Sequence, residues 1–359
     1  MKVFLAPMEG VVDYATRCIY SKLGGYDQFV TEFVRVSQNP VPASVFLKYC
    51  PELRTGGHTL EGIPVFVQLL GSDLENLATS AMTAVDLGAP GIDLNFGCPA
   101  KTVNRHDGGA TLLRSPERLF SVVSIVRKAV PAHIPVTAKV RLGFDHKDFV
   151  KDIAQAAQAG GAFHLTVHAR TKVEGYKPPA HWEYIGSMRE AVTIPVIANG
   201  DIWSVSDYQK CREISGCENI ALGRPAIACP DLAHQIKAWV AGKSDDYCSQ
   251  TWSEVLNQLF LPFIQLSQDY LGDRYALNRG KQWLKLLGRQ YKEAQILFEQ
   301  ARTAQTLDQF RHEIEPPSQT QATGNTENVR QSTAWLSADR KPHGWHHGDS
   351  ATGETFLNP

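Results

Sequence analysis

The segment LNFGCPAKTVNRHDGGATLL at 94–113 places a thiol where it could take part in chemistry. Cys98 stands between Gly97 and Pro99, at the point where an apolar run meets a turn. A thiol with an unperturbed pKa of about 8.5 stays mostly protonated at neutral pH, so it can act as a general acid. A buried structural cysteine is the alternative, since cysteine is among the residues most often found in protein cores.

Three polar side chains interrupt apolar runs that are otherwise typical of buried strands. They are Gln68 in PVFVQLL, Lys139 in PVTAKVRLG and His168 in FHLTVHAR. Solvation explains polar residues in loops, but it does not explain a lysine inside an apolar run, because a buried ammonium needs a partner. We therefore expect these three side chains to line a functional site.

Two short motifs further along the chain indicate a phosphate site. They are Asn199-Gly200-Asp201 and Gly223-Arg224. Glycine lets the backbone approach a ligand closely, and arginine pairs with phosphate oxygens. In α/β barrels, phosphate often binds at the loops after the seventh and eighth strands. The two motifs predict such a site if the runs before them are those strands.

The elements that would position these residues are eight apolar, β-branched runs separated by helix-like segments. The runs are VFLAPM (3–8), QFVTEFV (28–34), PVFVQLL (64–70), GIDLNFG (91–97), PVTAKVRLG (135–143), FHLTVHAR (163–170), IPVIANGD (194–201) and ENIALGR (218–224). Segments at 74–87, 116–130 and 148–159 have helical patterns. Eight strand-helix units predict an α/β fold, the (β/α)8 TIM barrel, in which strand ends carry the functional residues. A doubly wound sheet is the alternative, but no Gly-rich fingerprint follows the first run.

The pattern changes after residue 242, where we predict that a barrel domain at 1–242 ends. Helical periodicity without strand signals predicts a small helical domain at 250–312, and its segment 271–292 carries six basic residues against one acidic residue. The chain as a whole has a formal net charge of -1, so a nucleic acid would need a local basic patch of this kind. A solvated helix face is the alternative. The polar composition at 316–359 predicts a disordered tail.

Composition also limits the compartment and the class of protein. The seven cysteines include no CxxC pair, which favours reduced thiols in the cytoplasm and no metal site. No apolar run approaches the roughly 20 residues of a membrane span, and no signal-peptide pattern is present. We therefore expect a cytoplasmic protein that does not contact membranes.

These motifs together resemble a known family. APMEGV at 6–11, TEFVRV at 31–36, VQLLG at 67–71, DLNFGCPAKTVN at 93–104, GGATLL at 108–113, KVRLG at 139–143, VHART at 167–171, VIANGDI at 196–202 and GRPA at 223–226 are similar to the flavin-dependent tRNA-dihydrouridine synthases. The resemblance covers roughly 1–312 and is strongest to the bacterial C-type enzymes, which act on uridine 16 of the tRNA D-loop. It implies FMN as the cofactor, NADPH as the reductant with NADH possible, and tRNA as the partner.

The resemblance also implies roles for individual residues. Cys98 matches the cysteine that donates a proton to C5 of uracil after hydride transfer to C6. The residues implied to contact FMN are Pro7, Met8, Glu9 and Gln68 along the ring, Lys139 and His168 near its pyrimidine side, and Asn199, Gly200, Asp201, Gly223 and Arg224 around the phosphate. The residues implied to contact tRNA are Asn95, Arg141 and Tyr176 at the target uridine, and Arg35, Arg279 and Lys281 along the tRNA backbone.

We therefore interpret the chain as a tRNA-dihydrouridine synthase that acts as a monomer without a stable protein partner. Two alternatives remain. A flavoenzyme similar to dihydroorotate or dihydropyrimidine dehydrogenase would share the barrel but act on a free pyrimidine, and the basic helical segment argues against it. A non-catalytic RNA-binding barrel would keep the basic segment, but Cys98, Lys139 and His168 argue against that.

Overall fold

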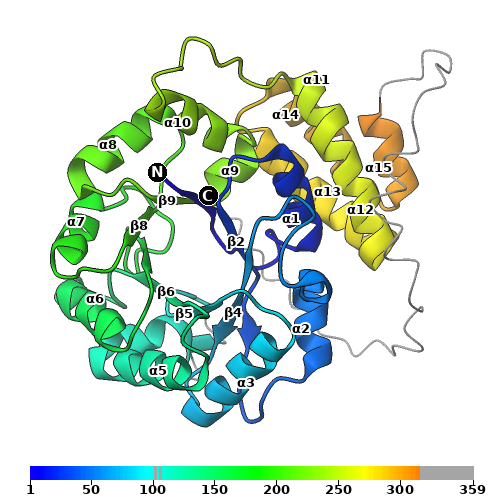
Figure 1. The fold of residues 1–359 in the computed structure, drawn as a ribbon. Helices are drawn as coiled ribbons and strands as arrows, with labels where there is room; N and C mark the ends of the chain where they lie inside the picture. Colours follow the sequence, from blue (N-terminus) through cyan, green and yellow to red (C-terminus); the bar gives the residue numbers. More distant parts are fainter. Residues whose placement is uncertain (101–102, 105–106, 316–359) are drawn as a thin grey trace.

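The computed structural model describes residues 1–100, 103–104 and 107–315 and shows a closed barrel of parallel strands surrounded by helices (Figure 1). The strands run in the order β2-β1-β9-β8-β7-β6-β5-β4-β3, and an additional β2–β4 pairing closes the ring. They are β1 (Val3–Leu5), β2 (Gln28–Val30), β3 (Val34–Arg35), β4 (Val65–Leu70), β5 (Ile92–Asn95), β6 (Val136–Arg141), β7 (Leu165–His168), β8 (Val196–Asn199) and β9 (Ile220–Leu222). The predicted TIM barrel is confirmed, and ring closure excludes the doubly wound sheet.

The second run departs from the prediction, because it forms two short strands instead of one. β2 pairs with β1 and β4, whereas β3 pairs with β4 alone, at Val34 and Leu69. Between them the backbone turns at Thr31 and Glu32. The Thr31 hydroxyl accepts a hydrogen bond from Gln68 N at 3.0 Å, and the Glu32 carboxylate accepts one from Gly10 N at 2.5 Å. The first bond joins β4 to the segment between β2 and β3, and the second joins that segment to the loop after β1.

Helices follow most strands and cover the outside of the barrel (Figure 1). They are α1 (Tyr14–Leu23), α2 (Ala43–Tyr49), α3 (Leu74–Asp86), α5 (Pro116–Ala129), α6 (Val150–Ala159), α7 (Trp182–Glu190), α8 (Val205–Ser215), the short α9 (Arg224–Ala228) and α10 (Leu232–Val240). The sequence signals place the ends of the three predicted helices well. The Asp73 carboxylate accepts a hydrogen bond from Asn76 N at 2.9 Å, and Pro116 lies in the first turn of α5. Strand and helix alternate as the apolar pattern predicts.

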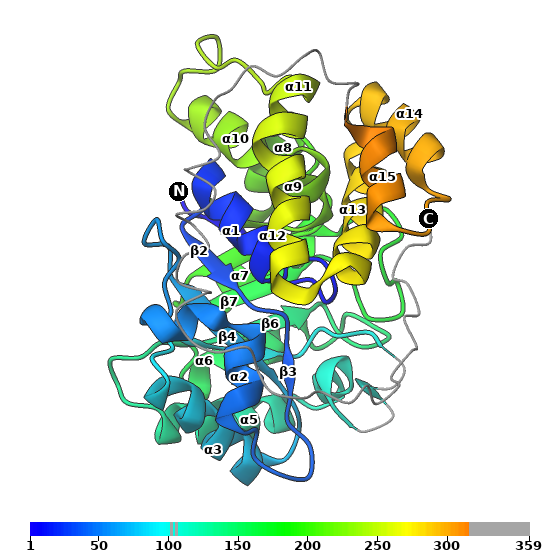
Figure 2. The same cartoon turned by 90° about the vertical axis from the view of Figure 1, so that its right-hand side faces the viewer.

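The C-terminal helices pack against one side of the barrel, next to α1 and α9 (Figure 2). They are α11 (Trp252–Glu254), a π-helical turn (Val255–Phe260), α12 (Leu261–Leu271), α13 (Asp273–Leu287), α14 (Lys292–Ala301) and α15 (Leu307–Ile314). The Trp283 indole donates to Ile227 O at 2.9 Å and packs edge-on against Phe263. The helices at 252–314, named the helical segment below, therefore share one core with the barrel. The predicted tail at 316–359 lies outside the described residues.

None of the helices in the described ranges combines the length and the apolar character that a membrane crossing requires.

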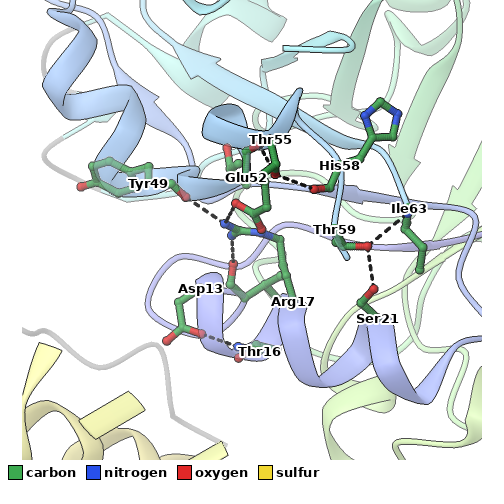
Figure 3. Close-up of polar contacts among 12 residues, drawn as sticks. Asp13, Thr16, Arg17, Ser21, Tyr49, Glu52, Thr55, His58, Thr59 and Ile63 are labelled. Atoms are coloured by element: carbon green, nitrogen blue, oxygen red, sulfur yellow. Dashed lines mark hydrogen bonds and ion pairs between the residues drawn. The ribbon is translucent and has the colours of Figure 1, made fainter. Parts of the chain in front are cut away.

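A buried ion pair joins α1 to the residues that follow α2 (Figure 3). Arg17 has no exposed surface, and its guanidinium bonds the Glu52 carboxylate at 2.8 and 3.0 Å. The same guanidinium donates to Val12 O at 3.1 Å and to Tyr49 O at 2.9 Å. Because Val12 belongs to the loop between β1 and α1, the ion pair also helps to hold that loop.

We expect Arg17→Met to lower the free energy of unfolding by about 3–5 kcal/mol, since it leaves the Glu52 carboxylate buried without its partner. Urea denaturation measures the change. Arg118→Met is the matched control, because it breaks the exposed Arg118–Asp107 pair and should cost about 1 kcal/mol or less. Equal losses in the two variants would show that burial of the Arg17 pair has no special weight.

Candidate active site

A pocket opens at the carboxyl ends of the barrel strands, and most of the residues predicted for the site line it. Those residues are Pro7, Met8, Glu9, Gln68, Asn95, Cys98, Lys139, Arg141, His168, Tyr176, Asn199, Gly200, Asp201, Gly223 and Arg224. They come from nearly every strand of the barrel, so the ring closure is what brings them together. Phe33 and Leu286 also line the pocket, although neither was a candidate from sequence. Leu286 lies on α13, so the helical segment contributes to the wall of the pocket.

The Asn95 side chain connects the barrel interior to the loop that carries the thiol. Its Oδ1 accepts hydrogen bonds from Gly97 N and Cys98 N, both at 2.9 Å, and its Nδ2 donates to Gln68 Oε1 at 2.9 Å. Gln68 in turn donates to the buried Asp93 carboxylate at 2.7 Å. The resemblance implied a contact between Asn95 and the target uridine. In the structure its bonds hold the cysteine loop, a role that the sequence did not indicate.

A glycine supports the other side of the cysteine loop. Cys98 O accepts hydrogen bonds from Ala110 N at 3.3 Å and from Asn104 Nδ2 at 3.2 Å. Gly109 has φ +59°, and a Cβ at this position would lie 3.0 Å from Cys98 O and 3.2 Å from Cys98 Cβ. A side chain at residue 109 would therefore displace the cysteine, which explains one of the two adjacent glycines noted in the sequence.

The electrostatics of the pocket keep the thiol protonated. Cys98 is 7% exposed, and burial raises the pKa of its thiol. A hydrogen bond from the Ala100 backbone and the charge of Arg141 act in the opposite direction, whereas the Glu9 carboxylate raises the pKa further. The net shift is upward, so Cys98 is a neutral thiol at physiological pH and can donate a proton.

Lys139 and His168 differ in charge although both lie in the pocket. Burial and the neighbouring Arg141 lower the pKa of Lys139 to about 8, with the Asp93 carboxylate opposing the shift, so Lys139 remains mostly protonated at neutral pH. Burial, together with Arg141 and Lys139, lowers the pKa of His168 well below its usual value, and the imidazole is neutral. Its Nδ1 is buried and has no hydrogen-bond partner among the described residues. Of the two, Lys139 supplies the positive charge, and His168 lines the pocket as a neutral imidazole.

Arg141 ties two loops of the rim together. Its Nε donates to Gly97 O at 2.8 Å, and its Nη1 donates to Thr171 O at 3.1 Å and to Gly175 O at 2.8 Å. Its guanidinium carbon lies 5.1 Å from the ring centre of Tyr176. Arg141 therefore links the cysteine loop to the loop after β7, in addition to lining the pocket.

The ends of β8 and β9 form the predicted phosphate end of the pocket. Gly200 has φ +121°, a conformation that favours glycine, and Arg224 follows Gly223 at the start of α9. The carboxylate of Asp201 forms an ion pair with the fully buried Arg170 and lies 3.9 Å from Arg224. A carboxylate would repel a phosphate, so the side chain of Asp201 fits a role in orienting arginines better than direct contact.

Asn199 is also engaged within the protein. Its Nδ2 donates to Ala221 O at 2.7 Å, so this amide joins β8 to β9.

Two of the basic residues predicted to contact tRNA form hydrogen bonds within the protein. Arg279 is 6% exposed, and its Nε bonds the Asp13 carboxylate at 2.7 Å while its Nη2 donates to Val11 O at 2.5 Å. The expectation of a cation on an open helix face is wrong for Arg279, because α13 packs this face against the loop between β1 and α1. The ammonium of Lys281 donates to Ala304 O. Arg35 is exposed but does not line the pocket.

Comparison with known proteins agrees with this architecture. A family model described as dihydrouridine synthase matches residues 4–330. Proteins from Pseudomonas putida and Aquipseudomonas alcaligenes, both named tRNA-dihydrouridine(16) synthase, are 53% and 51% identical; the alignments cover 84% and 86% of this chain and 93% and 98% of the relatives. A solved 2-naphthoyl-CoA reductase complex shares the fold alone, with a TM-score of 0.52, 12% identity and coverage of 69% of this chain and 51% of that chain.

A closed parallel barrel with its pocket at the carboxyl ends of the strands has the architecture of a TIM-barrel enzyme. The chain belongs to the dihydrouridine synthase family, and it is a flavin-dependent oxidoreductase.

We expect the alkylation of Cys98 by iodoacetamide to rise with pH around a midpoint above that of free cysteine, because burial raises the pKa of the thiol and the thiolate is the reactive form. Mass spectrometry of the peptide that contains Cys98 follows the reaction. Asn95→Ala should speed alkylation at every pH, since it frees the loop, whereas Asn95→Asp keeps both acceptor bonds and should have a smaller effect. A midpoint below that of free cysteine would contradict the neutral thiol.

Proposed function

We propose that this protein reduces uridine in tRNA to 5,6-dihydrouridine, with FMN as the cofactor, NADPH or NADH as the reductant and position 16 of the D-loop as the target. The observation that carries the proposal is the neutral Cys98 thiol at the rim of a pocket that also holds Lys139. Membership of the dihydrouridine synthase family supports the reduction of uridine as the reaction of the flavin, and the names of the two relatives support uridine 16 as the target.

The residues of the pocket fit FMN. A planar ring with polar edges suits a site where the buried His168 Nδ1 has no partner in the described ranges and where Lys139 provides a positive charge. Positive charge near the pyrimidine part of a flavin stabilises its reduced anion. Gly200 and Gly223 line the pocket without side chains, and Arg224 would supply a cation for the phosphate. Pro7, Met8, Glu9 and Gln68 would complete the contacts with the ring.

FMN held by these residues would, once reduced, supply the hydride that is added to C6 of uracil. Cys98 then donates its proton to C5, and the thiolate that remains takes a proton from solvent, so that one hydride and one proton are added across the double bond. Burial keeps the proton on the thiol until the reaction begins, and the charge of Arg141 stabilises the thiolate that the transfer leaves. Asn95 acts by fixing the direction in which the thiol points.

We expect the purified protein with NADPH to form dihydrouridine at position 16 of tRNA and to leave free uracil unchanged. Nuclease digestion and mass spectrometry of the tRNA give the position. Reduction of free uracil would instead support the first alternative, a flavoenzyme similar to dihydroorotate or dihydropyrimidine dehydrogenase. No reduction of either substrate would support the second alternative, a non-catalytic RNA-binding barrel. In the same assay Cys98→Ala should retain flavin and accept electrons from NADPH, yet lose about 10²–10⁴-fold in turnover, because the proton donor is absent.

Cys211→Ala is the matched control for this experiment, since it removes another buried thiol that does not line the pocket. It should keep the wild-type rate. Wild-type turnover by Cys98→Ala would remove the thiol from the mechanism while leaving the flavin chemistry in place.

We expect Arg224→Ala to weaken FMN binding by about 1.5–3 kcal/mol, because it removes a charge-assisted contact with the phosphate. Quenching of FMN fluorescence on titration into the apoprotein measures the affinity. Arg212→Ala removes an arginine whose side chain is exposed on α8 and should leave the affinity unchanged. Riboflavin, which lacks the phosphate, should bind the wild type and Arg224→Ala with similar affinity; a large difference would place the effect of Arg224 elsewhere.

A further inference from the structure

Arginine side chains alternate with aromatic rings along the rim of the pocket. Arg141 and Arg224 lie 5.1 and 4.9 Å from the ring centre of Tyr176. Arg224 also lies 5.8 Å from the ring of Trp203, and Arg289 lies 5.1 Å from the same ring. These five residues are named the rim row below, and their order is Arg141, Tyr176, Arg224, Trp203 and Arg289. The row begins on β6 and ends at Arg289, in the turn after α13.

The arginines of the rim row differ in the hydrogen bonds and ion pairs that they form within the protein. Arg141 donates to three backbone carbonyls, and Arg224 faces the carboxylate of Asp201. Arg289 is exposed, and its guanidinium makes no hydrogen bond or ion pair with any residue in the described part of the chain. The donors of Arg289 are therefore free for an anion.

Trp203 restricts where the Arg289 guanidinium lies. The backbone N of Trp203 donates to the Asp207 carboxylate at 3.0 Å, which ties the tryptophan to the start of α8. A guanidinium stacked on an indole keeps its edge donors available while losing rotamer freedom in advance. Less freedom is then lost when an anion binds, so the contact is stronger than that of a mobile surface lysine.

The position of this pair indicates what it binds. Neither Trp203 nor Arg289 lines the pocket, so a ligand enclosed there does not explain them. A polynucleotide that inserts one base into the pocket must carry its neighbouring phosphates across the rim. Arg279 and Lys281, the basic residues first expected to meet those phosphates, are bonded within the protein.

We infer that Arg289, held in place by Trp203, binds a backbone phosphate of the tRNA substrate close to the target nucleotide. The inference rests on the proposed function and adds to it a specific contact between the helical segment and the RNA. Arg289 touches the RNA, and Trp203 is a positioning residue that acts through Arg289.

The first test compares tRNA binding by the flavin-loaded wild type and Arg289→Gln over a range of salt concentrations. The variant should bind about five- to tenfold more weakly at low salt, and the slope of log affinity against log salt should fall by about 0.7–0.9, the change expected for one lost phosphate contact. Lys285→Gln is the matched control, since it removes one exposed charge from α13 without an aromatic partner, and its affinity should stay within about twofold of the wild type. Equal effects of the two variants would overturn the inference.

A second set of variants tests the part played by Trp203. Arg289→Lys keeps the charge but not the planar stacking, so it should retain the salt slope and lose about two- to threefold in affinity. Trp203→Leu should weaken binding in the wild type and have no added effect in Arg289→Gln, because the two residues act together. Equal effects in both backgrounds would show that Trp203 does not act through Arg289.

The readouts separate this inference from the proposed function. Flavin content of the Arg289 variants should match the wild type, since Arg289 lies outside the pocket. A wild type that fails to bind tRNA contradicts the proposed function itself. A wild type that binds tRNA, with Arg289→Gln binding equally well and with the same salt slope, contradicts the inference alone.

Discussion

The geometry of the site depends on the hydrogen bonds of the Asn95 side chain. Its oxygen holds two successive backbone amides of the cysteine loop, while its nitrogen is bonded to Gln68 inside the barrel. The chain of bonds continues through Asp93 to the Thr137 hydroxyl, at 2.6 Å, on the next strand. Arg141 and Asn104 also bond this loop, but they bond its carbonyl oxygens, whereas Asn95 holds its amides. The position of the thiol is therefore set by the packing of three adjacent strands.

A second constraint joins the helical segment to the same pocket. The Asp13 carboxylate caps α1 through Thr16 N at 2.8 Å and also accepts hydrogen bonds from Tyr275 and Arg279 of α13, at 2.5 and 2.7 Å. Burial raises the pKa of Asp13, but the ion pair with Arg279 outweighs this and holds the pKa below its usual value. The carboxylate thus stays charged. Because the loop before α1 lines the pocket with Met8 and Glu9, α13 supports the pocket from outside the barrel.

Burial raises the pKa of the Cys98 thiol and lowers the pKa of the His168 imidazole. Both shifts leave the side chain uncharged, which suits a pocket where uridine is reduced. Removal from water disfavours charge, so the thiol of Cys98 keeps its proton while His168 loses its own. Lys139 retains most of its charge because Asp93 lies close enough to oppose the shift. The neutral thiol of Cys98, the neutral imidazole of His168 and the ammonium of Lys139 therefore line the same pocket.

The sequence by itself determined the barrel and the membership of its rim. The alternation of apolar runs with helical segments is visible in the sequence because local residues decide whether a segment forms a strand or a helix. Parallel strands that close into a ring must then bring Gln68, Lys139 and His168 to one end of the barrel. Tertiary structure decided how the polar side chains are used. A run of basic residues in the sequence shows where charge lies along the chain, but not which face of α13 is covered in the fold. Arg279 on α13 is buried, whereas Arg289, in the turn after α13, is exposed. The same holds for Asn95, because a hydrogen bond depends on partners that only the folded chain brings within reach.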